Sequence, residues 1–371
     1  MPETDMLRCA IYRGGTSKGV MFRENDLPRA EDARTKLLLR VFGSPDLKQI
    51  DGLGGATMQT SKAMVVGPSS KPNADVQMTF AQISLKDASV DWSSVCGNMT
   101  SAVGPFAINE GMVRAAEPVT SVRIYSVNAD KYVTAHIPVK NGKAATEGDF
   151  EIPGVPGTGA RIDLEWIDPA GSITGKLLPT GNPRDEVKLR DGRRFTISIV
   201  DAGNLTVFCS AAELGLHGTE LPAEFDANKE IQATIEELRS IGGEMSGLAA
   251  SAGMPKIGFV AAPTAYTGLG SRKVAAEDMD VLARLMSAQL MHKSYMGAGA
   301  VCTSAAAAIE GTVVNSLRAR ATRDSEIVRI GHPAGVMDSR VIARQENGAT
   351  VIESGSFART ARRIMEGFAY L

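Results

Sequence analysis

The sequence predicts an α+β protein of two similar domains, each built on a mixed or antiparallel sheet with few helices. Stretches rich in β-branched residues outnumber helical ones and do not alternate strictly with them, as a doubly wound parallel sheet requires. Glycines, 38 in number, cluster in short runs between apolar segments, which indicates many tight turns joining strands. Two sequence patterns recur roughly 190 to 200 residues apart, which indicates a duplicated unit.

The expected strands combine β-branched or aromatic residues with partial alternation of apolar and polar positions. They are 9–12, 20–22, 62–66, 76–84, 122–127, 132–138, 161–166, 195–200, 206–210, 256–261 and 336–343.

Apolar residues at helical spacing predict a smaller number of helices. These are 30–41, 98–110, 229–241, 277–291 and 300–309. The second ends at Gly111, which suits a C-cap. In 277–291 the helical spacing is carried by Met279, Leu282, Met286 and Leu290.

The chain has 371 residues, which is long enough for two domains of about 150–200 residues each. The turn-rich segment DPAGSITGKLLPTGNPRDEV (168–187) lies near the midpoint. We therefore expect domains of 1–182 and 183–371, with the last residues returning to the first domain.

Two pairs of similar segments support the duplication. IYRGGTSKGVMF (11–22) and IVDAGNLTVF (199–208) each read as strand, glycine-containing turn and strand. TSAVGPFAINEG (100–111) and TSAAAAIEG (303–311) each read as a small-residue helix that ends in Glu-Gly. The alternative is chance similarity between segments rich in glycine and alanine.

Composition excludes several classes of function. The chain is 43% hydrophobic and 22% charged with a net charge of −2, and no basic stripe predicts nucleic-acid binding. No apolar run is long enough for a membrane span, and MPETDMLRCAIYRGG does not read as a signal peptide, so we expect a cytoplasmic protein. The cysteines (9, 96, 209 and 302) and histidines (136, 217, 292 and 332) are scattered without CxxC or HExxH, which predicts no metal site.

The sequence motifs that bind common cofactors are also incomplete or absent. GGTSKG (14–19) lacks the order of a phosphate-binding P-loop, because Ser17 precedes Lys18. DGLGGAT (51–57) has Thr57 where a dinucleotide fingerprint needs glycine, and no GxSxG nucleophile elbow occurs.

Three glycine-containing segments remain. The first, GGTSKG, places the backbone amides of a turn beside Thr16, Ser17 and Lys18. Amides, hydroxyls and an ammonium together suit a carboxylate. The alternative is an ordinary hairpin turn with a solvated lysine.

The second segment, DGLGGATMQTSK (51–62), leads from Gly54 and Gly55 through Thr60 and Ser61 into an apolar strand that begins with Lys62. Desolvation at such a position favours a neutral amine that can act as a general base. The alternative is a surface lysine whose stem packs on the strand while its ammonium stays in water.

The third segment, CGN (96–98), opens the helix expected over 98–110. A helix N-terminus favours the thiolate of Cys96 and offers amides to a carboxylate, and Gly97 lets the backbone approach a ligand closely. The alternative is a buried structural cysteine.

The other cysteines read as structural residues. When the two Thr-Ser-Ala runs are aligned, the counterpart of Cys96 is Gly299, so a second thiol is missing. One thiol together with the amine of Lys62 fits proton removal and delivery at different carbons better than inversion at one carbon.

At these residues the chain strongly resembles the 2-methylaconitate cis–trans isomerase family of propionate catabolism. The shared motifs run in order from about residue 13 to residue 367: RGGTSKGVMF, GSPD, KQIDGLGGAT, TSK, VDW, CGN, VGPFAI, PTGNP, MGAGAV and GHPAG. The superfamily includes 4-oxalomesaconate tautomerases and methylitaconate isomerases. The resemblance implies a diaminopimelate-epimerase-like fold, with two pseudo-symmetric domains whose sheets wrap around a central helix, and no metal or organic cofactor.

The resemblance also implies roles for individual residues. Lys62 and Cys96 match the family's catalytic residues. The expected substrate-binding residues are Thr16, Ser17, Lys18, Gly54, Gly55, Thr60, Ser61, Gly97, Asn98, Met296, Gly297 and His332. The chain departs from the pattern at Ala334, where several relatives carry serine, which bears on substrate choice.

The predicted function is therefore a cofactor-independent isomerase that shifts a proton and a C=C double bond in a small unsaturated tricarboxylate of the 2-methylaconitate or aconitate type. A 4-oxalomesaconate tautomerase, a methylitaconate isomerase, an epimerase on the same fold and a non-catalytic tricarboxylate-binding protein are the alternatives. A structural partner of a dehydratase is a weaker one. The expected partner is a small polycarboxylate, and the assembly is left open, with a homodimer as one option.

Overall fold

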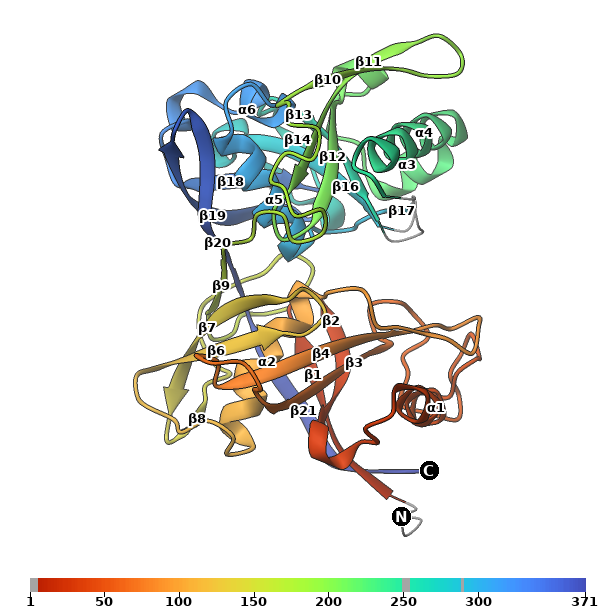
Figure 1. Cartoon of the computed structure of the whole chain (residues 1–371), viewed down its shortest axis with the longest axis vertical. Helices are drawn as coiled ribbons and strands as arrows, with labels where there is room; N and C mark the ends of the chain where they lie inside the picture. Colours follow the sequence, from red (N-terminus) through yellow and green to blue (C-terminus); the bar gives the residue numbers. More distant parts are fainter. Residues whose placement is uncertain (1–5, 249–253, 288–289) are drawn as a thin grey trace. The chain divides into compact units, whose positions relative to one another are not determined.

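The structure, a computed structural model, describes residues 6–248, 254–287 and 290–371. The chain forms two compact units (Figure 1). Unit 1 comprises Met1–Leu164 and Ala358–Leu371, and unit 2 comprises Glu165–Phe357. The chain passes between the units inside two strands, β9 (Ile162–Ile167) and β20 (Ala349–Arg359).

Unit 1 contains mainly strands and two helices. Its elements are β1 (Met6–Gly14), β2 (Ser17–Arg23), α1 (Glu31–Phe42), β3 (Lys62–Pro68), β4 (Val76–Ile83), β5 (Val90–Asp91), α2 (Gly97–Asn109), β6 (Val119–Ser126), β7 (Lys131–Lys140), β8 (Lys143–Ala144) and β21 (Ala361–Tyr370). Strand β21 pairs antiparallel with β1, so the C-terminal segment belongs to this unit.

Unit 2 repeats this plan with extra short elements. Its elements are β10 (Asp185–Lys188), β11 (Arg194–Asp201), β12 (Leu205–Ser210), α3 (Pro222–Ala227), α4 (Lys229–Met245), β13 (Lys256–Ala261), β14 (Tyr266–Thr267), β15 (Lys273–Val274), β16 (Val281–Ser287), β17 (Leu290–Met291), α5 (Gly297–Ala308), α6 (Val313–Leu317), β18 (Ile327–His332) and β19 (Gly335–Glu346).

The strand pairings confirm the predicted duplication. In unit 1 the order is β1, β2, β3, β4, β6, β7, and the β2–β3 and β4–β6 pairs are parallel. In unit 2 the order is β11, β12, β13, β16, β18, β19, and the β12–β13 and β16–β18 pairs are parallel. Each parallel pair needs a crossover connection, and helices α2 and α5 occupy equivalent ones.

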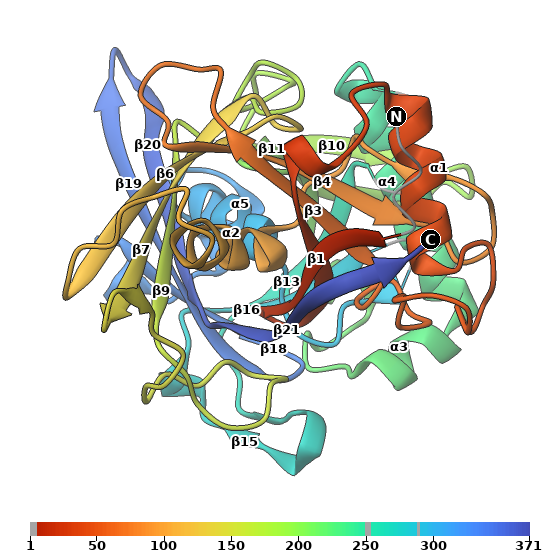
Figure 2. The ribbon, with the colours of Figure 1, turned by 90° about the horizontal axis from the view of Figure 1, so that it is seen from below.

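Helices α2 and α5 form the centres of their units. Every residue of α2 from Gly97 to Ile108 is buried, and α5 is buried from Gly297 to Ala307. Figure 2 shows α2 with strands of unit 1 on several sides. Small residues make this possible: a Cβ on Gly104 would lie 2.3 Å from Cδ1 of Ile137 on β7. The predicted arrangement of a sheet wrapped around a helix is therefore confirmed.

Four of the five predicted helices are present, as α1, α2, α4 and α5. Gly111 follows α2 with a φ of 73°, in the left-handed conformation expected of a C-cap glycine. The longest helix, α4, has 17 residues. Within the described ranges no helix is long and apolar enough to cross a membrane.

The helix predicted over 277–291 is wrong. The segment contains a 3-10 turn at Ala276–Asp278 and the strands β16 and β17, with residues 288–289 outside the described residues. Strand β16 pairs with β13 on one side and β18 on the other, and Val281, Leu282 and Leu285 are all fully buried. A strand buried on both faces shows no alternation, so its apolar run also satisfied helical spacing.

The expected division after residue 182 differs from the division into units, which falls at residues 164 and 165. The segment between these positions is held in unit 2 by Asp201, a buried residue at the end of β11. Its carboxylate accepts hydrogen bonds from the amides of Ile173 (2.9 Å) and Thr174 (2.6 Å) and from the hydroxyl of Ser172 (2.9 Å). A turn-rich composition therefore marked a loop of unit 2 rather than a linker.

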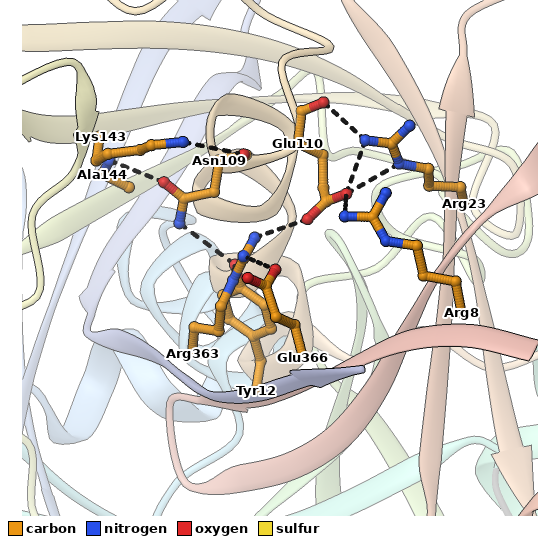
Figure 3. A network of polar contacts seen from close by, with 9 residues as sticks. All are labelled: Arg8, Tyr12, Arg23, Asn109, Glu110, Lys143, Ala144, Arg363 and Glu366. Carbon is orange, nitrogen blue, oxygen red and sulfur yellow. Dashed lines mark hydrogen bonds and ion pairs between the residues drawn. The ribbon is translucent and has the colours of Figure 1, made fainter. Parts of the chain in front are cut away.

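A cluster of charges holds the C-terminal end of α2 (Figure 3). The Glu110 side chain is 4% exposed and forms ion pairs with Arg8 (3.0 Å), Arg23 (2.8 Å) and Arg363 (2.9 Å). Arg363 also donates to the hydroxyl of Tyr12 (2.8 Å). Cations at a helix C-terminus oppose the negative end of the helix dipole. The network connects β1, β2 and β21 to α2 and so helps to place the opposite end of the helix.

We expect Glu110→Ala to lower the free energy of unfolding by about 2–3 kcal/mol, because three guanidiniums lose a shared carboxylate. The value lies below that of a fully buried pair because the arginine side chains are 21–43% exposed. Urea denaturation measures the effect. Glu310→Ala is the matched control: Glu310 belongs to the equivalent Glu-Gly pair 200 residues later but is exposed, so a change of under about 0.5 kcal/mol is expected. Equal effects of the two variants would contradict the proposed role of the cluster.

Candidate active site

Lys62 is the first residue of β3, where the parallel β2 strand places Gly19 beside it and the antiparallel β4 strand places Gln82 beside it. Its Nζ donates a hydrogen bond of 2.5 Å to Oε1 of Gln82 and lies 5.1 Å from the centre of the Phe80 ring. Among the described residues Lys62 forms no ion pair. The amine is thus held by a neutral acceptor and an aromatic face.

Gln82 determines how Lys62 is held. Its Nε2 donates to the carbonyl oxygens of Ser61 (2.8 Å) and Met58 (3.2 Å), so the amide oxygen must face the lysine. The side chain is 9% exposed. Gln82 was not among the site residues predicted from the sequence. Its one visible signal is a polar residue between Ala81 and Ile83 in an apolar strand.

The loop before Lys62 is organised around another buried glutamine, Gln49. Its Oε1 accepts from the hydroxyl of Ser61 (2.6 Å) and the amide of Ala56 (2.9 Å). A Cβ on Gly54 would lie 2.1 Å from Gln49 Cδ, and one on Gly55 would lie 2.4 Å from Thr60 Cβ. Ser61 is fully buried. These four predicted site residues therefore shape the loop that delivers Lys62.

The turn between β1 and β2 packs directly on the start of α2. A Cβ on Gly14 would lie 2.6 Å from the carbonyl oxygen of Asn98, and one on Gly15 would lie 2.3 Å from its Oδ1. Asn98 donates through Nδ2 to Thr16 Oγ1 (2.9 Å). Ser17 is 5% exposed, and the amide of Lys18 donates to the carbonyl of Gln59.

Cys96 is the N-cap residue of α2, with extended backbone angles, and its carbonyl accepts from the amide (2.9 Å) and hydroxyl (3.0 Å) of Thr100. Its thiol is partly exposed, whereas the other cysteines are buried. Burial raises the pKa of Cys9, and it raises the pKa of Cys209 and of Cys302 to about 12. Cys96 is therefore the most accessible of the four cysteines.

The elements that carry Lys62 and Cys96 meet at Gly19. A Cβ on Gly19 would lie 2.7 Å from the carbonyl oxygen of Lys62 and 2.8 Å from Cε of Met99 in the first turn of α2. The structure thus brings together the turn carrying Thr16 to Lys18, the start of β3 and the N-terminus of α2.

The remaining predicted residues, Met296, Gly297 and His332, belong to unit 2. His332 ends β18, is fully buried, and stacks on Tyr295 with ring centres 6.2 Å apart. Its Nδ1 accepts from the amide of Ala334 (3.2 Å). A Cβ on Gly297 would lie 2.2 Å from the Phe357 ring.

The structure corrects the predicted counterpart of Cys96. Met296 is the N-cap of α5 as Cys96 is of α2, and the Glu-Gly pairs after both helices keep the same offset of 200 residues. Gly299 was selected because the Thr-Ser-Ala runs were aligned, and these lie one helical turn out of step. A thioether stands in the second position, so the single-thiol interpretation is unchanged. Lys256, the first residue of β13, is the topological counterpart of Lys62.

Two arginines near the β1–β2 turn were not predicted as site residues from the sequence. Arg13 donates to the carbonyls of Gly15 (3.0 Å) and Thr360 (2.8 Å). Arg359, at the end of β20 and 4% exposed, donates through Nε to Oδ1 of Asn98 (2.9 Å). Arg359 is more than 260 residues from Asn98 in sequence, so no local pattern could connect them.

Over the part of the chain that the structure describes, no three His, Cys, Asp or Glu side chains gather in a way that could hold a metal ion. The groups at the site are an amine, a thiol, hydroxyls and helix amides. Such a set can move protons and bind carboxylates.

Comparisons with known proteins place the chain among isomerases of small carboxylic acids. The chain matches the family described as PrpF protein over residues 5–371. It is 44% identical to the 3-methylitaconate isomerase of Eubacterium barkeri, with 100% of this chain and 98% of the relative covered. It is 42% identical to the 2-methyl-aconitate isomerase of Shewanella oneidensis (99% and 97% covered) and 35% identical to the 4-oxalomesaconate tautomerase of Pseudomonas putida (97% and 94% covered).

Solved structures give the same fold. The crystal structure of methylitaconate-delta-isomerase aligns with a TM-score of 0.86 at 43% identity and covers 99% of this chain and 95% of that chain. A hydroxyproline epimerase from Agrobacterium vitis aligns with a TM-score of 0.58 at 11% identity (100% and 94% covered), which bears on fold alone. The predicted diaminopimelate-epimerase-like fold is confirmed.

Proposed function

The chain belongs to the PrpF protein family and is an isomerase, and we propose that it moves a proton, and with it a C=C double bond, within a small unsaturated tricarboxylate. The proposed substrate is of the 2-methylaconitate or aconitate type. The observation that carries this proposal is the placement of Lys62: its amine is held by Gln82 and Phe80, and its backbone packs through Gly19 against the first turn of α2.

In the proposed first step Lys62 acts as a general base. Its neutral amine removes a proton from a carbon γ to a carboxylate across the double bond, and the electron pair of that C–H bond delocalises to give a dienolate. The absence of an ion pair to Lys62 among the described residues supports this role, since a nearby carboxylate would favour the ammonium.

The developing negative charge needs preorganised donors. The amides at the start of α2 around Gly97 and Asn98, together with the turn that carries Ser17 and Lys18, supply such donors. General acid–base help typically contributes roughly 10²–10⁴-fold, so this electrostatic stabilisation carries much of the remaining rate enhancement.

In the second step the proton returns from Lys62, or another is delivered by Cys96. Protonation at the far end of the dienolate moves the double bond. Rotation of the dienolate followed by protonation at the original carbon gives cis–trans isomerisation. Both outcomes conserve atoms and electrons and require no redox partner.

Methylitaconate is the second candidate substrate, because the chain also resembles a named isomerase of that acid. These acids differ by small groups, and a pocket separates a methylene-sized difference by only about 1–3 kcal/mol. The small polycarboxylate partner, a cytoplasmic location and a homodimer stay predictions.

Proton NMR in D₂O tests the function. The enzyme is incubated with 2-methylaconitate, aconitate, methylitaconate and 4-oxalomesaconate in turn. Deuterium uptake at an allylic carbon, together with a shifted or inverted double bond, is expected for at least one acid and identifies it. If all four acids bind, as line broadening would show, yet none exchanges, the protein is a binding protein and the catalytic roles must be withdrawn.

A further inference from the structure

Arg359 is a buried cation that reaches the candidate site from a distant part of the sequence. It is the last residue of β20 and belongs to the C-terminal segment of unit 1. Its Nε donates to Oδ1 of Asn98 (2.9 Å), and a terminal nitrogen donates to the carbonyl of Ala358 (2.9 Å). Asn98 is the second residue of α2 and two residues from Cys96.

The guanidinium determines the orientation of Asn98. Arginine can only donate, so the Asn98 side chain must turn its oxygen toward Arg359. Its Nδ2 then donates to Oγ1 of Thr16 (2.9 Å). Thr16 accepts in this bond, so the hydroxyl hydrogen of Thr16 is left to donate elsewhere. If the Asn98 amide were reversed, two donors would face each other. Arg359 therefore sets the hydrogen-bond polarity of the turn.

The backbone of the turn is fastened to the same strand. The amide of Gly15 donates to the carbonyl of Thr360 (2.9 Å), the residue after Arg359. A Cβ on Gly15 would lie 2.3 Å from Asn98 Oδ1 and 3.0 Å from Cδ of Arg359. A side chain at position 15 would therefore displace Asn98, which is why the close packing of the turn on Asn98 requires glycine there.

Arg359 also interacts electrostatically with Cys96. Burial lowers the pKa of the guanidinium to about 10, and a negative charge on Cys96 raises it again. The guanidinium is therefore positively charged at neutral pH. Because Arg359 donates to Asn98 in the first turn of α2, this cation lies near the N-cap residue Cys96 and adds to the positive end of the helix dipole.

We propose that Arg359 is a positioning residue of the isomerase site, which orients Asn98 and Thr16 toward a carboxylate of the substrate and supplies the buried positive charge beside Cys96. The proposal rests on the proposed function for its effect on turnover. Its effect on Cys96 can be measured without any substrate.

The test uses the full chain and three variants: Arg359→Met, Arg359→Lys and, as the control, Arg362→Met on an exposed arginine of the following strand. Cys96 is alkylated at neutral pH by neutral iodoacetamide and by anionic iodoacetate, since the other thiols are buried. Cys96→Ser identifies any background labelling. The ratio of the two rates reports the local charge and is insensitive to general accessibility.

Arg359→Met is expected to lower the iodoacetate-to-iodoacetamide ratio at least threefold, because the buried cation no longer attracts the anionic reagent. Arg359→Lys keeps a charge and is expected to retain most of the ratio. Arg362→Met should match the unmodified protein. An unchanged ratio in Arg359→Met would overturn the charge role, whether or not any acid is turned over.

The positioning role is tested by steady-state kinetics with the acid that the NMR experiment identifies as the substrate. Arg359→Met and Arg359→Lys should raise KM at least tenfold, because neither offers the Nε–H that orients Asn98. Gly15→Ala, whose Cβ would press on Asn98 Oδ1 and on Cδ of Arg359 but which keeps the guanidinium, should raise KM while keeping the alkylation ratio. An unchanged KM in both Arg359 variants, each with an unchanged midpoint of thermal unfolding, would overturn this role. Loss of turnover by the unmodified protein would instead count against the proposed function.

Discussion

Lys62→Met is expected to reduce kcat by at least roughly 10³-fold, which lies within the range for loss of a general base. Methionine has a similar length and can still pack over Phe80, so the start of β3 keeps its shape. Because the reaction begins with proton removal by the amine, deuterium uptake into the substrate should disappear together with double-bond movement. Proton NMR in D₂O measures both quantities in one experiment.

Two further variants make the Lys62 result specific. Lys256→Met alters the topological counterpart in unit 2 and is expected to retain activity, which separates the role of the amine from that of a lysine at the start of a strand. Lys62→Ala leaves space for an added alkylamine, which should restore part of the exchange. Retention of more than about one-tenth of the activity in Lys62→Met would exclude Lys62 as the required base.

Gln82→Glu is expected to lower activity at neutral pH by roughly tenfold or more, because a carboxylate beside Lys62 favours its protonated form. The base must be neutral to accept a proton, so activity should rise again as the pH increases. A glutamate oxygen would also face the carbonyls of Met58 and Ser61, where Nε2 now donates. The loop that delivers Lys62 should therefore loosen as well.

Gln82→Met separates these two effects. It removes the acceptor of Lys62 and the donors to the loop but adds no charge. Its activity should fall without the recovery at high pH that marks the glutamate variant. Rate profiles from pH 7 to 10 for both variants make the comparison. Identical profiles would show that Gln82 supports the loop alone and does not govern the protonation of Lys62.

Local chemistry explains why much of this protein could be predicted from its sequence. GGTSKG, TSK and CGN lie at a turn, a strand start and a helix start, as expected, because glycine and capping preferences act over a few residues. The duplication was visible for the same reason: each half repeats its own strand, turn and helix signals.

The two wrong predictions, the helix over 277–291 and the counterpart of Cys96, have a different cause. The segment 277–291 was predicted as a helix because β16 is buried on both faces, which removes the alternation that marks a strand. The counterpart of Cys96 was misplaced because α5 is so rich in small residues that its register is ambiguous without helix ends.

The sequence by itself determined the family, the strand-and-turn plan and the places of Lys62 at a strand start and Cys96 at a helix start, since these depend on contiguous residues. Only the tertiary structure decided what holds them. Gln82 meets Lys62 through strand pairing, and Arg359 meets Asn98 across most of the chain. Such partners are selected by three-dimensional packing and hydrogen-bond geometry, which leave no periodic or local trace in the sequence.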